Sequence, residues 1–154
     1  MAFNPGVDTS DLDWLGIVLA VLASIVIGFI WYSPKMPTGR IWMKGIGMSM
    51  DHKPDQKAMM KGMVLMIVGA FLTMMVFMHV VLAFTESTWI ETGDELTMGM
   101  AAQGAFWTWL GFFLPMSMSG VAWESRPWSH GIVVATYYLV NLMVAAMIFT
   151  WRLA

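Results

Sequence analysis

The stretch that decides the fold is TMGMAAQGAFWTWLGFFLPMSM, residues 97–118. It contains no charged residue, and a helix of about 20 apolar residues is long enough to cross a bilayer. The spacing of its small residues places them in one stripe on one side of a helix, where they let a neighbouring helix approach closely in lipid. We therefore expect this helix to be the centre of a small transmembrane bundle. The stripe consists of Thr97, Ala101, Gly104, Thr108, Gly111 and Pro115.

The composition of the whole chain indicates that lipid is its solvent. Of the 154 residues, 58% are hydrophobic and only 12% are charged, whereas a soluble domain is typically about 45–50% apolar and about 25% charged. The net charge of −2 and the lack of a basic patch argue against a nucleic-acid partner. There is no cysteine, which excludes disulfides, thiolate metal sites and cysteine nucleophiles.

These features predict an all-α integral membrane protein, a four-transmembrane-helix bundle that forms one domain over residues 1–154. We expect the first apolar run to be retained as a span, because residues 1–13 carry three Asp and no Lys or Arg, unlike a signal peptide. The polar connection 33–61 contains Ile41-Trp42-Met43, which predicts a segment in the headgroup region. The expected spans are about 14–32, 62–84, 97–119 and 131–151.

The first predicted span carries a second series of small residues. Gly16, Ala20, Ser24 and Gly28 repeat every four residues, which is a helix-packing pattern in membranes. The alternative is that Gly and Ala are simply common in spans. We favour packing, because four consecutive small positions form the series.

The distribution of basic residues predicts the orientation. The first and third connections hold seven of the eight Lys and Arg residues, and only Arg152 lies elsewhere. Basic residues are concentrated in cytoplasmic loops, so we expect both of these connections inside and both termini outside. The expected location is the plasma (inner) membrane of a prokaryote, as a multi-pass protein.

Two polar side chains are expected in the outer half of the membrane. His79 and Gln103 each lie about 7–9 Å from the midplane at about 1.5 Å per residue. An ionisable residue inside the membrane is a functional-site hypothesis, here a proton relay or the lining of a solute path. The alternative, which we favour, is that neutral His79 bonds Gln103 or a backbone carbonyl, because one histidine without a carboxylate makes a poor relay.

Further polar side chains are expected near the midplane. Ser24, Thr73, Thr108 and Asn141 each lie near the middle of their own predicted span. An asparagine there typically bonds across helices and contributes about 0.6–2 kcal/mol. The other reading is a polar contact for a bound headgroup or solute. We favour the structural role, and the functional reading stays open.

The methionines raise the question of copper. The chain has 18 of them, and the thioethers of Met75 and Met78 lie close in sequence to the imidazole of His79, a ligand set that suits Cu(I). Methionines are nevertheless spread over the whole chain, which indicates that they fill positions that leucine would fill. We therefore expect no bound metal and no cofactor, with these three residues as the candidates if copper is handled.

The last predicted connection is the tight turn around Glu124, Ser125 and Arg126. Its two charged residues can pair with each other, or Arg126 can bind a lipid phosphate; we favour the turn. Trp128 is expected to anchor the turn at the membrane interface, and His130 is expected to be interfacial as well. No phosphate-binding glycine loop, zinc motif or nucleophile elbow is present.

Several short motifs, in order, resemble a known family. Trp31-Tyr32-Ser33-Pro34 and the Glu-x-Arg-Pro element at residues 124–127 are the most specific of them, with Gly39-Arg40-Ile41-Trp42-Met43, Trp109-Leu110-Gly111-Phe112 and Tyr138-Leu139-Val140 beside them. The chain resembles the small bacterial membrane proteins of the uncharacterised DUF1761 family over nearly its whole length. The resemblance implies a compact four-span protein and no assigned activity. The high methionine content and the longer acidic second loop depart from the pattern.

Our leading functional prediction is a non-enzymatic helix-packing subunit that self-associates or joins a larger membrane complex. The two small-residue faces motivate it, because a four-helix bundle uses only part of that surface internally. The alternative is a homo-oligomeric small-solute or ion pathway lined by His79, Gln103 and Asn141. Copper handling is third, and an enzyme is not expected.

Overall fold

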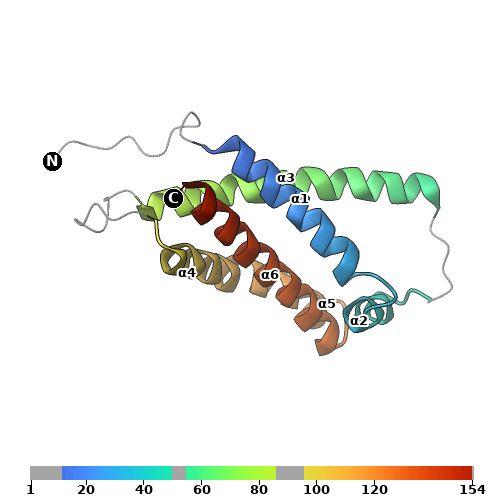
Figure 1. The fold of residues 1–154 in the computed structure, drawn as a ribbon. Coiled ribbons are helices and arrows are strands. Elements are labelled where there is room, and N and C mark those ends of the chain that lie inside the picture. The colour runs from blue at the N-terminus through green and yellow to red at the C-terminus, as the bar shows by residue number, and fades with distance from the viewer. Residues whose placement is uncertain (1–11, 50–54, 86–95, 154) are drawn as a thin grey trace.

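The structure is a computed structural model that describes residues 12–49, 55–85 and 96–153. Every regular element in these ranges is helical, as the sequence predicts (Figure 1). Most of the acidic second loop and part of the connection 33–61 lie outside the described residues. The helices are α1 (Trp14–Trp31), α2 (Pro37–Gly45), α3 (Gln56–Thr85), α4 (Met98–Thr108), the π-helix η2 (Trp109–Phe113), α5 (Leu114–Trp123) and α6 (Trp128–Leu153).

Three of these helices are long and apolar enough to cross a membrane: α1, α3 over Gln56–Leu82, and α6. They correspond to the first, second and fourth predicted spans. Both α3 and α6 begin several residues before the predicted entry into the hydrocarbon, at Gln56 and Trp128. The predicted third span also folds as continuous helical backbone, but it is divided into α4, η2 and α5.

Pro115 gives a physical reason for that division. Proline has no N–H and its ring clashes with the carbonyl four residues back, so an α-helical turn cannot close regularly there. The preceding turn instead widens to a π-helix, in which the Leu114 N–H donates to the carbonyl of Trp109, five residues back. The predicted small-residue stripe is split at this point: Ala101 and Gly104 are buried, whereas Gly111 is exposed.

The centre of the bundle is α6, which contacts all of the other described helices. The expectation that the third span would be central is therefore wrong. Small residues let neighbours approach α6 closely: Ala145 and Ala146 are buried, and a Cβ added at Gly131 would lie only 2.8 Å from Val121 of α5. Two indoles add hydrogen bonds to α6 carbonyls. Trp31 donates to Val133 (3.2 Å) and Trp109 donates to Ala135 (2.7 Å).

The apolar core lies where α1, α6 and the C-terminal half of α3 meet. Phe77 of α3 and Phe149 of α6 are fully buried, with ring centroids 5.9 Å apart. The four small residues of the first-span series are all buried in α1. At Gly16, an added Cβ would lie 2.7 Å from the Asp13 carboxylate and in ordinary contact, at 3.5 Å, with the methyl group of Met78, so the missing side chain leaves room for Asp13.

The short helix α2 packs across the end of the bundle beneath α1 and α6 (Figure 1). Its buried residues are Gly39 and Met43, while Arg40 and Lys44 are exposed. A Cβ at Gly39 would collide with the carbonyl of Ser33, so only glycine allows this close approach. The predicted headgroup segment is thus a helix that closes one end of the bundle.

The opposite end is joined by an ion pair. Arg152, near the end of α6, donates from Nε and Nη2 to the two carboxylate oxygens of Asp13, just before α1, at 2.8 and 3.2 Å. The beginning of α1 and the end of α6 therefore lie at the same end of the molecule.

Candidate functional site

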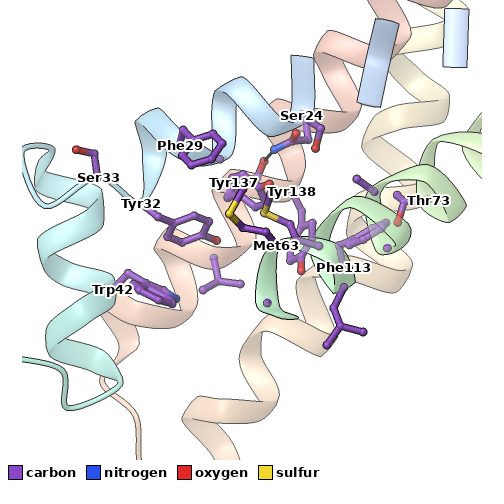
Figure 2. Close-up of a pocket in the computed structure, with 18 of the residues that line it drawn as sticks. Ser24, Phe29, Tyr32, Ser33, Trp42, Met63, Thr73, Phe113, Tyr137 and Tyr138 are labelled. Atoms are coloured by element: carbon purple, nitrogen blue, oxygen red, sulfur yellow. Dashed lines mark hydrogen bonds between the residues drawn. The ribbon is translucent and has the colours of Figure 1, made fainter. Parts of the chain in front are cut away.

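A cavity of about 1090 Å³ lies between α1, α3 and α6, with Phe113 of η2 at its side. Figure 2 shows Tyr32 and Trp42 at one end, Thr73 at the other, and Tyr137, Tyr138 and Met63 between them. The cavity exists because α3 packs on the bundle only through its C-terminal half. Its N-terminal half diverges from α1 and α6 (Figure 1), and its residues 55–69 are exposed except Met63.

The lining is mainly aromatic and aliphatic. Tyr32 contacts both Trp42 and Tyr137, with ring centroids 5.0 and 4.9 Å apart, and Tyr138 stacks at 4.8 Å on Phe113. A Cβ added at Gly28 would lie 3.2 Å from the Tyr137 hydroxyl oxygen, so the small residue of α1 makes room for this phenol. Among the described residues, none of the lining side chains is acidic, basic or histidine.

Of the described residues that line the cavity, Asn141 is the one with a buried polar side-chain atom that has no hydrogen-bond partner. The side chain is 4% exposed, and its Nδ2 donates 2.8 Å to the Tyr137 carbonyl one turn back. Oδ1 has no hydrogen-bond partner among the described residues. A buried acceptor without a partner is unfavourable and is seldom left so. Oδ1 has less than 1 Å² of exposed surface, so this acceptor is closed off from the cavity by its neighbours.

Three of the four predicted midplane residues meet here. Ser24 of α1, Thr73 of α3 and Asn141 of α6 all line the cavity. Ser24 and Asn141 also interact with the side chain of Tyr137. Thr108 is half-buried in α4 and does not line the cavity. The asparagine bonds a carbonyl of its own helix rather than another helix.

The family comparison covers almost the same part of the chain as these helices. The family described as "Protein of unknown function (DUF1761)" matches residues 15–150. The chain belongs to the DUF1761 family. No curated protein and no solved structure matches it.

The structure of this DUF1761 protein does not join His79 to Gln103. The Nδ1 atom of His79 lies 2.8 Å from the carbonyl of Met75, one turn back on α3. Gln103 is exposed on α4, and within the described ranges no hydrogen bond involves its side chain. Neither residue lines the cavity, so Asn141 is the only one of the three predicted pathway residues found there.

The candidate copper ligands have packing roles in this DUF1761 protein. Met78 is fully buried in the core against Gly16, and Met75 is half-buried. In the parts of the chain that the structure describes, no group of three His, Asp or Glu side chains comes together. The Nδ1 atom of His79 already has a hydrogen-bond partner in the carbonyl of Met75.

At the α5–α6 turn, Arg126 pairs with Glu124 at 2.6 Å and places Nη1 3.2 Å from the Nε2 of His130. Trp128 is exposed, as expected of an interfacial anchor, but His130 is 5% exposed beneath α2. A Cβ at Gly45 would collide with the His130 ring, which shows how closely α2 covers it. Ser125 adopts φ 56°, and the N–H groups of Glu124 and Arg126 both donate to Gly120.

Sequence reasoning missed most of the cavity. The aromatic residues Tyr32, Trp42, Tyr137 and Tyr138 were not singled out as one group, because they come from three separate elements. Gly62 and Gly69 are seven residues apart on one side of α3 and leave that face without side chains. The spacing alone does not distinguish an open face from a packing face.

Proposed function

We propose that this protein is a non-enzymatic integral membrane subunit that self-associates through the outer face of α4, η2 and α5. The observation that carries the proposal is Gln103, an exposed glutamine within a charge-free helical run. In a bilayer such an amide needs a partner, because no water is available in the hydrocarbon. Within the described residues Gln103 has none.

A second copy of the chain is the simplest partner for Gln103. A side-chain amide is both donor and acceptor, so two glutamines related by a two-fold axis can bond each other reciprocally. The neighbouring surface suits close approach: Trp107, one turn on, is 61% exposed, and a Cβ at Gly111 would meet open space. The buried stripe residues Ala101 and Gly104 already pack inside the protomer.

The proposal includes four spans in a prokaryotic plasma membrane with both termini outside. The helical run 98–123 supports a fourth span, because it is free of charged residues until Glu124. The Asp13–Arg152 pair supports a common side for the two ends. Lys and Arg in the first and third connections support that orientation, and spans without Asp or Glu favour a non-enzymatic role.

Disulfide cross-linking tests the interface cleanly, because the natural chain has no cysteine. Trp107→Cys introduces one thiol beside Gln103, and Leu72→Cys, on the exposed side of α3, is the matched control. We expect mild oxidation in native membranes to give a cross-linked dimer with Trp107→Cys and little with Leu72→Cys. Adding Gln103→Leu to Trp107→Cys should reduce the dimer severalfold, since an interhelical hydrogen bond contributes about 1–2 kcal/mol in lipid.

Two outcomes would contradict self-association through this face. One is equal cross-linking of Trp107→Cys and Leu72→Cys, which is the result of random collision. The other is a Trp107→Cys dimer that Gln103→Leu leaves unchanged. A stoichiometric cross-link to a different protein would replace the second copy with a partner in a larger complex.

A small-solute pathway is a second candidate, and the cavity at the level of Ser24, Thr73 and Asn141 favours it. No described residue with a charged side chain lines the cavity, which favours neutral solutes over ions. This candidate predicts that Asn141→Leu abolishes glycerol uptake into proteoliposomes while cross-linking through Trp107→Cys persists. Unchanged uptake in Asn141→Leu would remove it. Copper handling gains no support from the positions of Met75, Met78 and His79.

A further inference from the structure

We propose that His130 makes the docking of α2 depend on pH: a second proton on its ring releases the C-terminal end of α2 from the α5–α6 turn. The histidine lies at the end of the bundle that α2 closes, away from α4 and its exposed Gln103 (Figure 1). The proposal therefore goes beyond self-association and does not depend on it.

Arg126 determines which ring nitrogen of His130 carries the proton. Its Nη1 atom lies 3.2 Å from Nε2 of His130, and a guanidinium can only donate. Nε2 must therefore accept, which leaves the ring neutral with its proton on Nδ1. A second proton would have to bind at Nε2, where it would point at the N–H groups of a cation that does not deprotonate. The contact with Arg126 therefore requires the neutral ring.

The guanidinium of Arg126 is held in this position from two sides. Glu124 accepts a hydrogen bond from Nε at 2.7 Å and pairs with Nη2 at 2.6 Å. The stem of the arginine packs on Gly120, where an added Cβ would lie 3.1 Å from Cδ of Arg126. The positive charge therefore stays beside His130 when the ring takes up a proton.

Helix α2 covers the ring of His130. The residue is 5% exposed, and a Cβ at Gly45 would collide with the ring. Among the described residues, Nδ1 makes no hydrogen bond of ordinary geometry, although the backbone of Trp42 interacts with the ring. An imidazolium in this position would lack solvation and would lie next to Arg126, so the docked helix favours the neutral ring.

The other charged groups near the ring do not compensate a second proton. Among the described residues, Arg126 and Glu124 act on the ring from the turn. The Glu124 side chain is 55% exposed and already paired with Arg126, so its attraction for a protonated ring is screened. Helix α5 has no acidic, basic or histidine side chain, and the exposed Arg40 and Lys44 of α2 carry positive charge that disfavours the proton further.

The C-terminal end of α2 is the part that can move. The N-terminal end is tied to α1, where the Thr38 hydroxyl donates 2.6 Å to the Trp31 carbonyl. At the other end, the helix terminates at Gly45, and the chain turns at Gly47 with φ 72°, where an added Cβ would meet nothing within 4 Å. Lifting this end gives His130 access to water and leaves the contacts of α2 with α1 in place.

Release of α2 also changes the cavity between α1, α3 and α6. Trp42 lines one end of that cavity and contacts Tyr32, with ring centroids 5.0 Å apart. In the orientation proposed above, this end faces the cytoplasm. Acidification of the cell interior would then open the cavity at its cytoplasmic end.

Thiol protection on α2 tests the proposal in nanodiscs, where both ends of the protein meet the same buffer and the result does not depend on orientation. Met43→Cys places a thiol on the buried face of α2, in a chain that has no natural cysteine. Lys44→Cys, the next residue, is exposed and gives the intrinsic reactivity at each pH. The reagent is dithiodipyridine, which reacts with thiols in acid as well as at neutral pH.

The measured quantity is the protection of Met43→Cys relative to Lys44→Cys. Because the released state binds the second proton and the docked state does not, this protection should be constant above about pH 7. Below about pH 6.5, the ordinary pKa of histidine, it should fall by up to about tenfold per pH unit.

Substitutions assign the effect to one ring. His52→Gln with His79→Gln leaves His130 as the one histidine of the chain, and the pH dependence should persist. His130→Gln should make the protection independent of pH. Arg126→Gln keeps a donor and removes the charge, so the loss of protection in acid should be severalfold smaller, which decides the question if His130→Gln folds poorly. Val81→Cys, 1% exposed in the core, is the matched control and should stay protected at every pH.

Three results would each overturn the proposal. Protection of Met43→Cys that stays constant down to pH 5 would mean that α2 remains docked whatever the state of the ring. A decline that His130→Gln leaves unchanged would assign the effect to another group. A parallel decline at Val81→Cys would mean that the whole bundle unfolds in acid rather than α2 alone. None of these results bears on cross-linking through Trp107→Cys, so the two proposals fail separately.

Discussion

Two neighbouring stretches of α3, residues 62–70 and 71–82, are both free of Asp, Glu, Lys and Arg and have opposite environments. In the C-terminal half, Phe77 and Met78 are at most 1% exposed, packed against α1, α4 and α6. In the N-terminal half, Leu65 is 63% exposed and Gly62 faces open space. In lipid, apolar character does not drive a helix toward its neighbours, and only shape-matched packing does. Burial in this protein therefore follows the fit between helices rather than hydropathy.

The largest effect should come from the packed half. Phe77→Ala removes a fully buried ring that meets Phe149, and we expect a loss of about 3–5 kcal/mol in the free energy of unfolding. Phe71→Ala, less than two turns away on the exposed side, should change it by less than about 1 kcal/mol. Reversible unfolding in detergent micelles measures both. Similar losses for the two variants would remove the contrast between the halves.

Two glycines show the same contrast between packed and open positions. Gly39→Ala forces a Cβ into the Ser33 carbonyl at the α1–α2 junction and should destabilise by about 1–3 kcal/mol. Gly62→Ala meets nothing and should be neutral or stabilise by up to about 1 kcal/mol, because alanine favours a helix. Thermal unfolding of the two purified variants checks the signs. A destabilised Gly62→Ala would show that this face of α3 is covered.

A substitution in the α5–α6 turn should increase the stability of the protein, by less than the losses above. Ser125 has φ 56°, a left-handed conformation that is unfavourable for a residue with a Cβ. Ser125→Gly should stabilise the protein by about 1 kcal/mol, because glycine adopts this conformation freely. The shift in unfolding temperature relative to the natural chain is the measurement. No gain would mean that the turn relaxes when Ser125 is present.

The smallest effect concerns the Asp13–Arg152 pair. The hydrogen bond from Arg152 holds the pKa of the Asp13 carboxyl below its ordinary value, against partial burial that raises it. The pair thus stabilises the protein at pH values above the ordinary pKa of Asp13. This contribution is lost as the pH falls through the lowered pKa of the folded state. Unfolding of Arg152→Gln should show a slightly lower stability at neutral pH and a weaker decline below about pH 4. Parallel pH profiles would mean that the pair contributes nothing.

Most of the fold was predictable from the sequence. Charge-free apolar runs predict the membrane helices, and the series that begins at Gly16 and ends at Gly28 marks the α1 face that is buried. That Ser24, Thr73 and Asn141 meet was also predictable, because the position along each span follows from span order and the rise per residue. Three of the four residues predicted at that level meet in one cavity.

The parts of the fold that were not predicted depend on how each helix is rotated about its axis and tilted, which the sequence does not specify. The extra residue of the π-turn before Pro115 rotates the stripe, so that Ala101 is buried and Gly111 exposed. The divergence of α3 follows from which of its residues fit the grooves of α1 and α6, and neither 62–70 nor 71–82 contains Asp, Glu, Lys or Arg. For the same reason His79 and Gln103, predicted at one depth, lie apart in rotation and do not bond.

Native mass spectrometry of the protein drawn gently from its own membrane tests the account most directly. The account predicts two copies of the 17.2 kDa chain. The dimer should be lost in Gln103→Leu. A monomer, or a stable assembly with a different protein that Gln103→Leu leaves intact, would contradict it.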